Sequence, residues 1–393
     1  MKAVGPGLLV AAAGIGAGDM IIGIQLGLDF NLYYILAVLF ICLIKYTLTE
    51  GIARYQLVTG TFLIKGWART FPKFVHYSFF AFFLVWSLLV AAALTSACGI
   101  AGSALFPKGS ISLWGAIHAN VACIIVYLGK YALIEEISKW LIFLMVLIVV
   151  GTASILLING QVDFSQDDLM QYDRRTLYFA IAGAIGGSVT MLSYGYWIKE
   201  RGWDGVKDLA SVRTDLYVSY AITALFIIAL MVAASAADLE GTSGTQLVLA
   251  LANVLQLTLG PIGYILFKVA FWGVVFSSMV SVWSGVPYLF GDFWKGVSVS
   301  FAKDTSHRSK VYRGYLLYLT FVPIVLAIYV DAVRNVINYA LISAVFVLGL
   351  TVSLLLLNRK KMLGEWGNTQ SNDILLMVAV MIFAVLAIHR LWT

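Results

Sequence analysis

The stretch Gly14-Ile15-Gly16-Ala17-Gly18-Asp19 lies inside an apolar run at about residues 4–28, which is long enough to cross a bilayer as a helix. Three glycines at alternate positions weaken a helix, because each costs backbone entropy and adds no packing. A carboxylate at membrane depth, such as that of Asp19, is costly unless it faces a cavity and meets a cation. The stretch therefore predicts a broken transmembrane helix with an ion site at the break, as many transporters have.

The composition indicates an integral membrane protein. Of the 393 residues, 61% are hydrophobic and only 12% are charged, whereas soluble domains have roughly 25% charged residues. We expect a single membrane domain over residues 1–393, embedded in the lipid bilayer. The net charge of +6 does not require a nucleic-acid partner if the cationic residues gather on one side of the membrane.

Eleven apolar segments are long enough to span a bilayer, since roughly 20 residues suffice. They lie at about residues 4–28, 32–57, 74–105, 110–129, 140–159, 177–198, 214–237, 259–290, 314–332, 335–357 and 373–389. A short amphipathic surface helix is expected at Ser243–Gln256. The fold class is therefore an all-α integral membrane protein.

The distribution of Lys and Arg predicts the topology, because cytoplasmic loops carry an excess of positive charge. With the N-terminus in the cytoplasm, 18 of the 26 Lys and Arg residues fall on the cytoplasmic side and 5 on the outer side. The other three, Lys45, Arg54 and Lys268, lie within apolar segments. We predict a multi-pass protein of the cytoplasmic membrane with its N-terminus inside and its C-terminus outside.

The sixth segment repeats the feature of the first, since it contains Gly183-Ala184-Ile185-Gly186-Gly187-Ser188. Each broken helix opens a block of five segments, about residues 4–159 and 177–357, and the segment at 373–389 is an addition. Because five is odd, the two blocks enter the membrane from opposite sides and form an inverted repeat. Broken segments at corresponding positions of two repeats indicate a transport site.

The two breaks together offer a set of metal ligands. Asp19 would begin the outer half of the first helix, where the positive helix end stabilises a carboxylate and carbonyl groups near Gly16 are free. The Ser188 carbonyl and Met191 are expected at the end of the outer half of the sixth helix. Carboxylate, carbonyl and thioether ligands suit Mn²⁺ or Fe²⁺ better than Mg²⁺ or Ca²⁺. For Met191, ordinary helix packing is the competing interpretation.

Further residues are expected to line the substrate path. Glycines at the breaks let backbone groups approach an ion, and a buried lysine can serve as an internal counter-charge or replace a driving cation. This set comprises Gly18, Gly186, Gly187, Ser193, Tyr194 and Lys45.

The remaining polar residues at depth have plainer interpretations. Glu50 and Arg54 are spaced for an ion pair on one helix face, and Lys268 has no assigned partner. The four histidines and three cysteines are expected to serve packing. No nucleophile–base pair, phosphate-binding loop or zinc-ligand spacing is present, so we expect neither an enzyme nor a cofactor.

Several stretches together resemble the Nramp family of divalent-metal transporters. They are Gly5-Pro6-Gly7, Arg54 with Leu57-Val58-Thr59-Gly60, Ser188–Met191 and Arg359-Lys360-Lys361-Met362-Leu363-Gly364-Glu365. The resemblance covers nearly the whole chain. It implies a leucine-transporter-type fold with eleven helices in a 5+5 inverted repeat, alternating access and uptake of a divalent transition metal.

The chain also departs from the family pattern. The family's Asp-Pro-Gly-Asn appears as Gly16-Ala17-Gly18-Asp19, so the acid has moved by three residues. The family's Met-Pro-His appears as Met191-Leu192-Ser193, which keeps the thioether and loses the histidine. Proton-coupled members carry an Asp and a Glu in the third segment, whereas no acid occurs here from Phe74 to Phe106. We therefore expect weak or absent proton coupling.

The sequence thus favours a secondary transporter or facilitator whose substrate is a divalent metal ion, Mn²⁺ or Fe²⁺ before Mg²⁺. Two alternatives remain open at this point. The first is an amino-acid or organic-cation transporter of the same fold, because glycine-rich breaks can also hold substrate carboxylates and Asp19 suits an amine. The second is a membrane sensor that keeps the fold without transport. The sequence does not indicate the oligomeric state.

Overall fold

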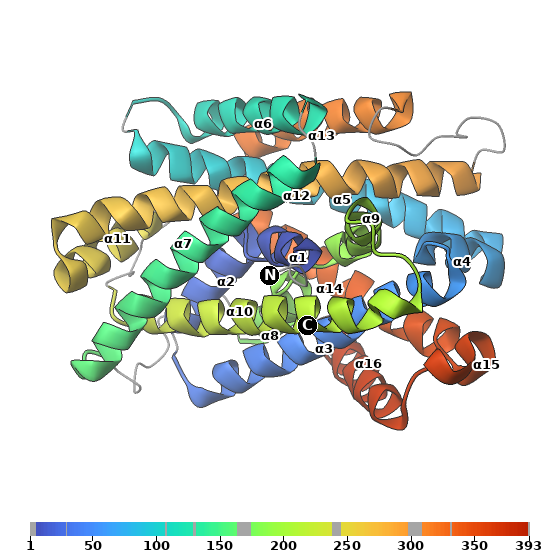
Figure 1. Ribbon diagram of the computed structural model, residues 1–393. Helices are drawn as coiled ribbons and strands as arrows, with labels where there is room; N and C mark the ends of the chain where they lie inside the picture. The colour runs from blue at the N-terminus through green and yellow to red at the C-terminus, as the bar shows by residue number, and fades with distance from the viewer. Residues whose placement is uncertain are drawn as a thin grey trace.

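The computed structural model describes residues 5–28, 30–106, 108–128, 131–162, 174–237, 245–297, 309–330 and 332–391, which contain helices and no strand (Figure 1). The first apolar run forms α1 (Pro6–Gly14) and α2 (Ala17–Leu28), and their axes differ by 53° at the break. Proline near the start of α1 is favourable, because the first helical N–H groups have no intrahelical partner. The predicted break in the first helix is confirmed.

The rest of the first block follows the expected order, with one surface helix inserted. These helices are α3 (Leu32–Thr59), α4 (Leu63–Thr70), α5 (Lys73–Leu105), α6 (Ile111–Leu128) and α7 (Tyr131–Ile158). At the start of α3, the Asn31 side chain accepts a hydrogen bond from Tyr34 N. At its end, Gly60 adopts a φ of +65°, the left-handed conformation that glycine tolerates best.

The second block begins with the second broken helix. Its elements are α8 (Arg174–Ala184), the 3₁₀ helices η1 (Val189–Ser193) and η2 (Val206–Asp208), α9 (Tyr194–Glu200), α10 (Leu209–Ser235), α11 (Thr245–Leu259), α12 (Pro261–Val297), α13 (Lys310–Tyr329) and α14 (Ala332–Leu357). The chain ends with α15 (Lys360–Leu363), η3 (Gly364–Trp366) and α16 (Gln370–Leu391). The amphipathic helix expected at 243–256 corresponds to α11.

Within the described ranges, nine helices are long and apolar enough to cross a membrane, and the bent pair α1–α2 makes a tenth. Helix α16 coincides with the eleventh expected segment, but its described apolar part, Gln370–Val385, is shorter than a span. The fifth segment begins earlier than expected, because α7 includes Glu135, Glu136 and Lys139. Glu136 and Lys139 form an ion pair of 3.2 Å at the helix end, and Glu135 pairs with Arg201.

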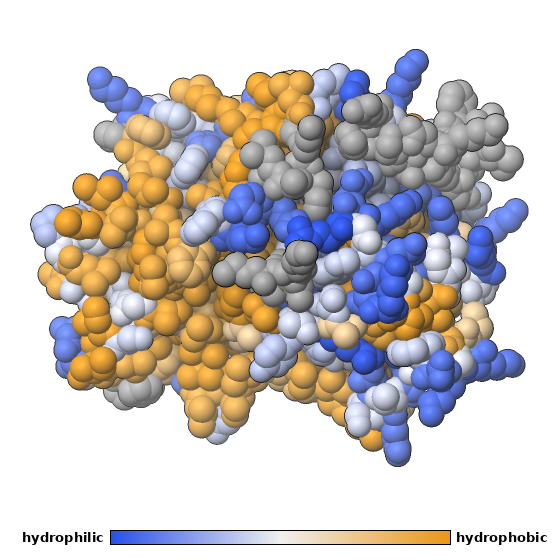
Figure 2. All heavy atoms as spheres, in the orientation of Figure 1, coloured by the Kyte–Doolittle hydropathy of each residue, from blue (hydrophilic) through white to orange (hydrophobic). Residues whose placement is uncertain are grey.

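The broken helices lie in the middle of the molecule (Figure 1). Helix α1 packs against α10 and α12, α2 against α10 and α14, and α8 against α14. The surface helices α4 and α15 lie at one end of the molecule and α11 at the opposite end. Figure 2 shows the face of the molecule that is turned to the viewer in Figure 1. Hydrophobic residues cover much of this face, and hydrophilic residues concentrate at the end that carries α4 and α15.

Candidate functional site

The two breaks meet backbone to backbone in the centre of the molecule. A Cβ on Gly14 would lie only 2.9 Å from the amide nitrogen of Gly187, so a side chain at position 14 would push the breaks apart. Gly186 and Gly187 have φ angles of +72° and +85°, in the left-handed region that favours glycine. The glycines of the two motifs thus permit this close approach.

Asp19 lies in the first turn of α2, as expected, and its side chain is fully buried. One carboxylate oxygen, Oδ2, accepts a long hydrogen bond of 3.4 Å from Gly186 N in the second break. The second oxygen, Oδ1, has no hydrogen-bond partner among the described residues. The helix N-terminus favours a negative charge here. An unpartnered buried carboxylate oxygen marks a place where a cation would be stabilised.

Lys45 reaches the same place from α3. Its side chain is fully buried, and its Nζ donates a hydrogen bond to the Gly187 carbonyl. Asp19 and Lys45 therefore contact the adjacent peptide groups of Gly186 and Gly187, and their opposite charges attract each other. The hydroxyl of Tyr220 donates to the neighbouring Gly186 carbonyl at 3.2 Å.

The structure corrects the expected positions of Ser188 and Met191. The first half of the sixth helix, α8, ends at Ala184, so neither residue lies at its end. Ser188 instead precedes η1, and Met191 lies within it. The reason is the left-handed pair Gly186–Gly187, which turns the chain before a new helical segment can start. Met191 is fully buried with its Cγ close to Gly187, and its N–H donates to the Ser188 carbonyl at 3.0 Å.

The carbonyl groups of the first break already take part in hydrogen bonds. The Gly16 carbonyl accepts from Met20 N at 3.0 Å, and the Ala13 carbonyl accepts from Ser278 Oγ at 3.3 Å. Each carbonyl oxygen has a second lone pair, so these bonds leave capacity for an ion. Gly18 lies against Ala184 of α8 and Tyr339 of α14, so it serves the packing of α2.

Ser193 and Tyr194 each contact another helix. Ser193 lies against Gly285 of α12. The Tyr194 hydroxyl donates to Asp215 Oδ2 at 2.9 Å, beside the N-terminus of α1.

Asp215 is a buried acid that the sequence pattern did not single out. Its carboxylate accepts hydrogen bonds from Gly5 N at 2.8 Å and Gly7 N at 2.5 Å, in addition to the bond from Tyr194. It therefore binds free N–H groups at the start of α1 from a distant helix, α10. The sequence signal was an acid at the edge of the seventh apolar segment, expected at 214–237. An acid at the edge of a segment resembles a loop residue, but α10 begins already at Leu209, so Asp215 lies within the helix.

The remaining charges at depth have structural partners. Arg54 pairs with Glu50 at 3.1 Å and donates to the Trp366 carbonyl and the Asn368 side chain, while Arg213 also pairs with Glu50 at 3.0 Å. This network fastens α3 to α10 and to the segment after α15. The ion pair expected between Glu50 and Arg54 is confirmed.

His118 and Lys268 also have partners within the protein. His118 Nδ1 lies 2.6 Å from the Trp114 carbonyl, and Nε2 accepts from Trp272 Nε1 at 2.6 Å, so both ring nitrogens are engaged. Lys268 donates to the Ala104 carbonyl at 3.2 Å and lies over the Tyr264 ring.

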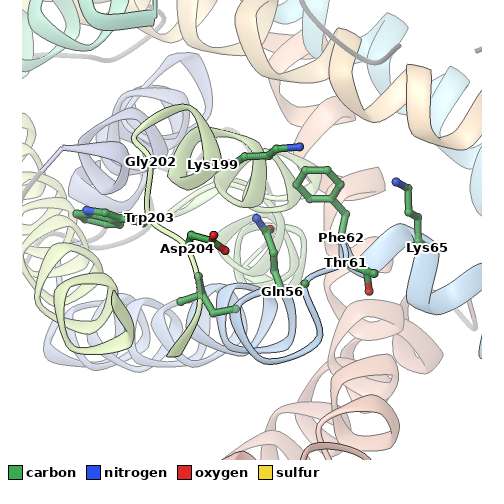
Figure 3. A pocket seen from close by; sticks show the side chains of 10 residues that line it. Gln56, Thr61, Phe62, Lys65, Lys199, Gly202, Trp203 and Asp204 are labelled. Carbon is green, nitrogen blue, oxygen red and sulfur yellow. The ribbon is translucent and has the colours of Figure 1, made fainter. Parts of the chain in front are cut away.

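A cavity of about 420 Å³ opens at the hydrophilic end, between the end of α3 and the segment after α9. Lys65 and Lys199 flank the ring of Phe62, with Nζ atoms 5.7 and 5.4 Å from its centroid (Figure 3). Gln56, Trp203 and Asp204 also line this cavity. Two ammonium groups disfavour a divalent cation there. Among the described residues, no group of three or more His, Cys, Asp or Glu side chains could hold a metal.

The comparisons with known proteins identify the family. A family model described as Nramp, natural resistance-associated macrophage protein-like, matches residues 7–393. The chain belongs to the Nramp family. The expected family assignment is confirmed, although the family's site motifs are altered here.

Solved structures agree with this membership at the level of the fold. A crystal structure of a mutant Eremococcus coleocola manganese transporter has a TM-score of 0.74 and 16% identity, over 97% of this chain and 84% of that chain. A structure of MhsT in complex with L-phenylalanine has a TM-score of 0.65 and 13% identity, over 97% of both chains. The leucine-transporter-type fold expected for this Nramp chain is therefore confirmed.

A curated relative of this Nramp chain is an uncharacterized protein of Pasteurella multocida (strain Pm70), 26% identical over 157 residues. That match covers 40% of this chain and 35% of the relative, so the chain spans about a third of the relative's length.

Proposed function

We propose that the protein transports a divalent metal cation, Mn²⁺ or Fe²⁺, across the cytoplasmic membrane by alternating access. The observation that carries this proposal is the fully buried carboxylate of Asp19, with one unpartnered oxygen among the described residues, at the meeting point of two broken helices. A helix N-terminus and approachable carbonyl groups surround it, which is the arrangement that transporters use for ions. Family membership and the manganese transporter of the same fold support a metal as the substrate.

The proposed ligands are the Asp19 carboxylate, the Met191 thioether and the carbonyl oxygens of Gly16 and Ser188. The carboxylate would supply charge and hard oxygen, and the thioether would add preference for a transition metal over Mg²⁺. Because fewer than three acidic, His or Cys side chains gather in any described cluster, carbonyl groups and water would complete the coordination of the ion.

The test is Mn²⁺ uptake by proteoliposomes containing the full chain, with Asp19→Asn as the variant. Asparagine keeps the size and hydrogen-bonding capacity of the side chain but removes its charge. We expect uptake to fall by about 100-fold or more, because a lost metal ligand costs at least as much as the loss of a residue that supports one. The partly exposed Asp208, changed to Asn, is the matched control and should leave uptake unchanged. Uptake that survives in Asp19→Asn would refute the metal site, and Mn²⁺ binding without uptake by the unaltered protein would indicate a sensor.

One observation also favours a second candidate, an organic amine as the substrate. The Lys45 ammonium already lies on the Gly187 carbonyl, so the second break accommodates a primary amine. Competition assays separate the two candidates. If amines or amino acids at millimolar concentration block Mn²⁺ uptake and are themselves accumulated, the substrate is organic. If only transition metals compete, the substrate is a metal.

A further inference from the structure

The central site already holds a positive charge that belongs to the protein. The Lys45 side chain enters from α3, is fully buried and donates to the Gly187 carbonyl, while its charge attracts Asp19. Lys45 and Gly187 are 142 residues apart in the chain. The ammonium group thus binds the carbonyl oxygen of Gly187, in the same break that Asp19 contacts through Gly186 N. The other oxygen of Asp19, Oδ1, has no partner among the described residues.

A divalent cation bound by Asp19 and the carbonyl groups beside Gly187 would lie close to this ammonium. Two like charges in a buried site repel each other strongly, because little water screens them. The metal and the ammonium therefore cannot both remain on these oxygens. The lysine side chain has four methylene groups, so its ammonium would leave Gly187 by rotation of this side chain while its Cα stays fixed on α3.

We propose that Lys45 is a tethered cation that fills the site when the carrier is empty and leaves the Gly187 carbonyl when the substrate cation binds. This inference rests on the proposed metal transport. An empty site with a lone buried carboxylate would be costly to move through an occluded state. A built-in ammonium removes that cost, so the empty carrier can return without a coupled ion. Lys45 also lowers the affinity for metal, because the metal must displace it.

The acid-free third spanning helix agrees with this role. Helix α5, Lys73–Leu105, contains no Asp or Glu, and its one histidine, His76, packs against Phe293 near the start of the helix. Because this helix offers no acid that could carry a proton beside the site, the counter-charge for Asp19 in the empty carrier must come from another group. Among the described residues, Lys45 is a fully buried cation, and its charge acts on Asp19.

The first test is thermal unfolding of the purified full chain at increasing Mn²⁺ concentrations. In the absence of metal, we expect Lys45→Met to unfold at a lower temperature than the unaltered protein. Mn²⁺ should raise its unfolding temperature at a concentration at least 10-fold lower than the unaltered protein requires, because no ammonium competes. Lys45→Gln, which keeps a donor for Gly187 without the charge, should behave likewise and serves if Lys45→Met does not fold. Lys268→Met is the matched control, since Lys268 also donates to a backbone carbonyl but far from the breaks.

The second test compares net uptake with exchange in proteoliposomes. The unaltered protein should fill metal-free vesicles about as fast as it exchanges Mn²⁺ between loaded ones. Lys45→Met and Lys45→Gln should keep exchange and lose net uptake by at least 10-fold, because only net uptake requires the empty carrier to return. A lysine that merely stabilised the fold would slow both processes equally.

The outcomes separate this inference from the proposed function. If the unaltered protein transports Mn²⁺ and the Lys45 variants match it in both tests, the tethered cation is refuted and the proposed function stands. If the unaltered protein shows no Mn²⁺ flux but the Lys45 variants gain stabilisation by Mn²⁺, the proposed function fails with the return step that rests on it, and only the displacement of Lys45 by a bound cation stands.

Discussion

At the scale of single residues, the proposed thioether ligand Met191 would give the site its preference for a transition metal. Its side chain is fully buried beside Gly187, so Met191→Leu is the informative change, because it keeps the volume and removes the sulfur. If the thioether is a ligand, the Mn²⁺ concentration for half-maximal uptake should rise by about 10-fold, while that for Mg²⁺ should change by less than about 2-fold. Met145→Leu, at a buried position in α7, controls for packing. Equal losses for both ions would remove sulfur from the ligand set.

The residues of the site differ in how far the sequence could predict them. The place of Asp19 at a helix break was predictable, because three glycines weaken the helix directly before it. The partner of Lys45 was not, since Gly187 lies 142 residues away and only the folded chain brings them together. Tyr194 follows the second break in sequence, yet its hydroxyl binds Asp215 rather than the break.

At the scale of elements, Gly183 sets how closely α8 approaches α14. A Cβ at this position would overlap the Ala340 carbonyl oxygen and lie 2.7 Å from Ala344 N. Both atoms belong to the backbone of α14, so Gly183→Ala must separate the helices, at a cost of about 1–3 kcal/mol. We expect a lower unfolding temperature in detergent. Gly151→Ala in α7 is the control, because no atom lies within 4 Å of its Cβ position and alanine favours helix by about 1 kcal/mol. Equal unfolding temperatures of the two variants would show that the close contact between α8 and α14 does not contribute to stability.

The Asp215 carboxylate holds the start of α1 through hydrogen bonds from Gly5 N and Gly7 N. Removing its charge in Asp215→Asn weakens bonds to Gly5 and Gly7 that contribute about 1.5–3 kcal/mol each when the acceptor is charged. A loss of about 1.4 kcal/mol corresponds to a 10-fold larger open population. Cys42, buried near Asp19, reports this opening when Cys98 and Cys123 are replaced by Ala. Its modification by a maleimide should accelerate by about 10-fold.

The control for this experiment is Asp208→Asn, whose carboxylate also accepts a backbone N–H, from Asp204, but on the surface. It should leave the modification rate unchanged. An unchanged rate in Asp215→Asn would show that this carboxylate does not restrain α1.

The elements themselves were largely predictable because each spanning helix is an apolar run. The errors fall where charges enter a helix, as at the start of α7, where Glu135 pairs with Arg201 at 3.1 Å and so stays in the helix. Hydropathy counts such residues as loop, whereas the fold supplies them with partners.

At the scale of the whole molecule, two cationic regions that the sequence assigned to the same side of the membrane can be compared with their positions in the structure. Helices α4 and α15, which carry Lys65, Arg69, Lys360 and Lys361, lie at the same end of the molecule. The structure thus places two of the cationic regions that the sequence assigned to one side at the same end. That this side faces the cytoplasm stays a prediction, and several of the loop residues counted for it, such as Lys303, lie outside the described residues.

The buried charges of the whole molecule bear on whether protons drive the transport. With no acid in α5 and a built-in cation at the central site, Mn²⁺ entry should proceed without proton entry, because intramembrane acids are the usual relays. In proteoliposomes with a pH-sensitive dye inside, we expect fewer than about 0.1 protons per Mn²⁺ ion. A protonophore added under an imposed pH gradient verifies that the dye responds. An inward proton current proportional to Mn²⁺ entry would contradict this, since protons would then enter together with the metal.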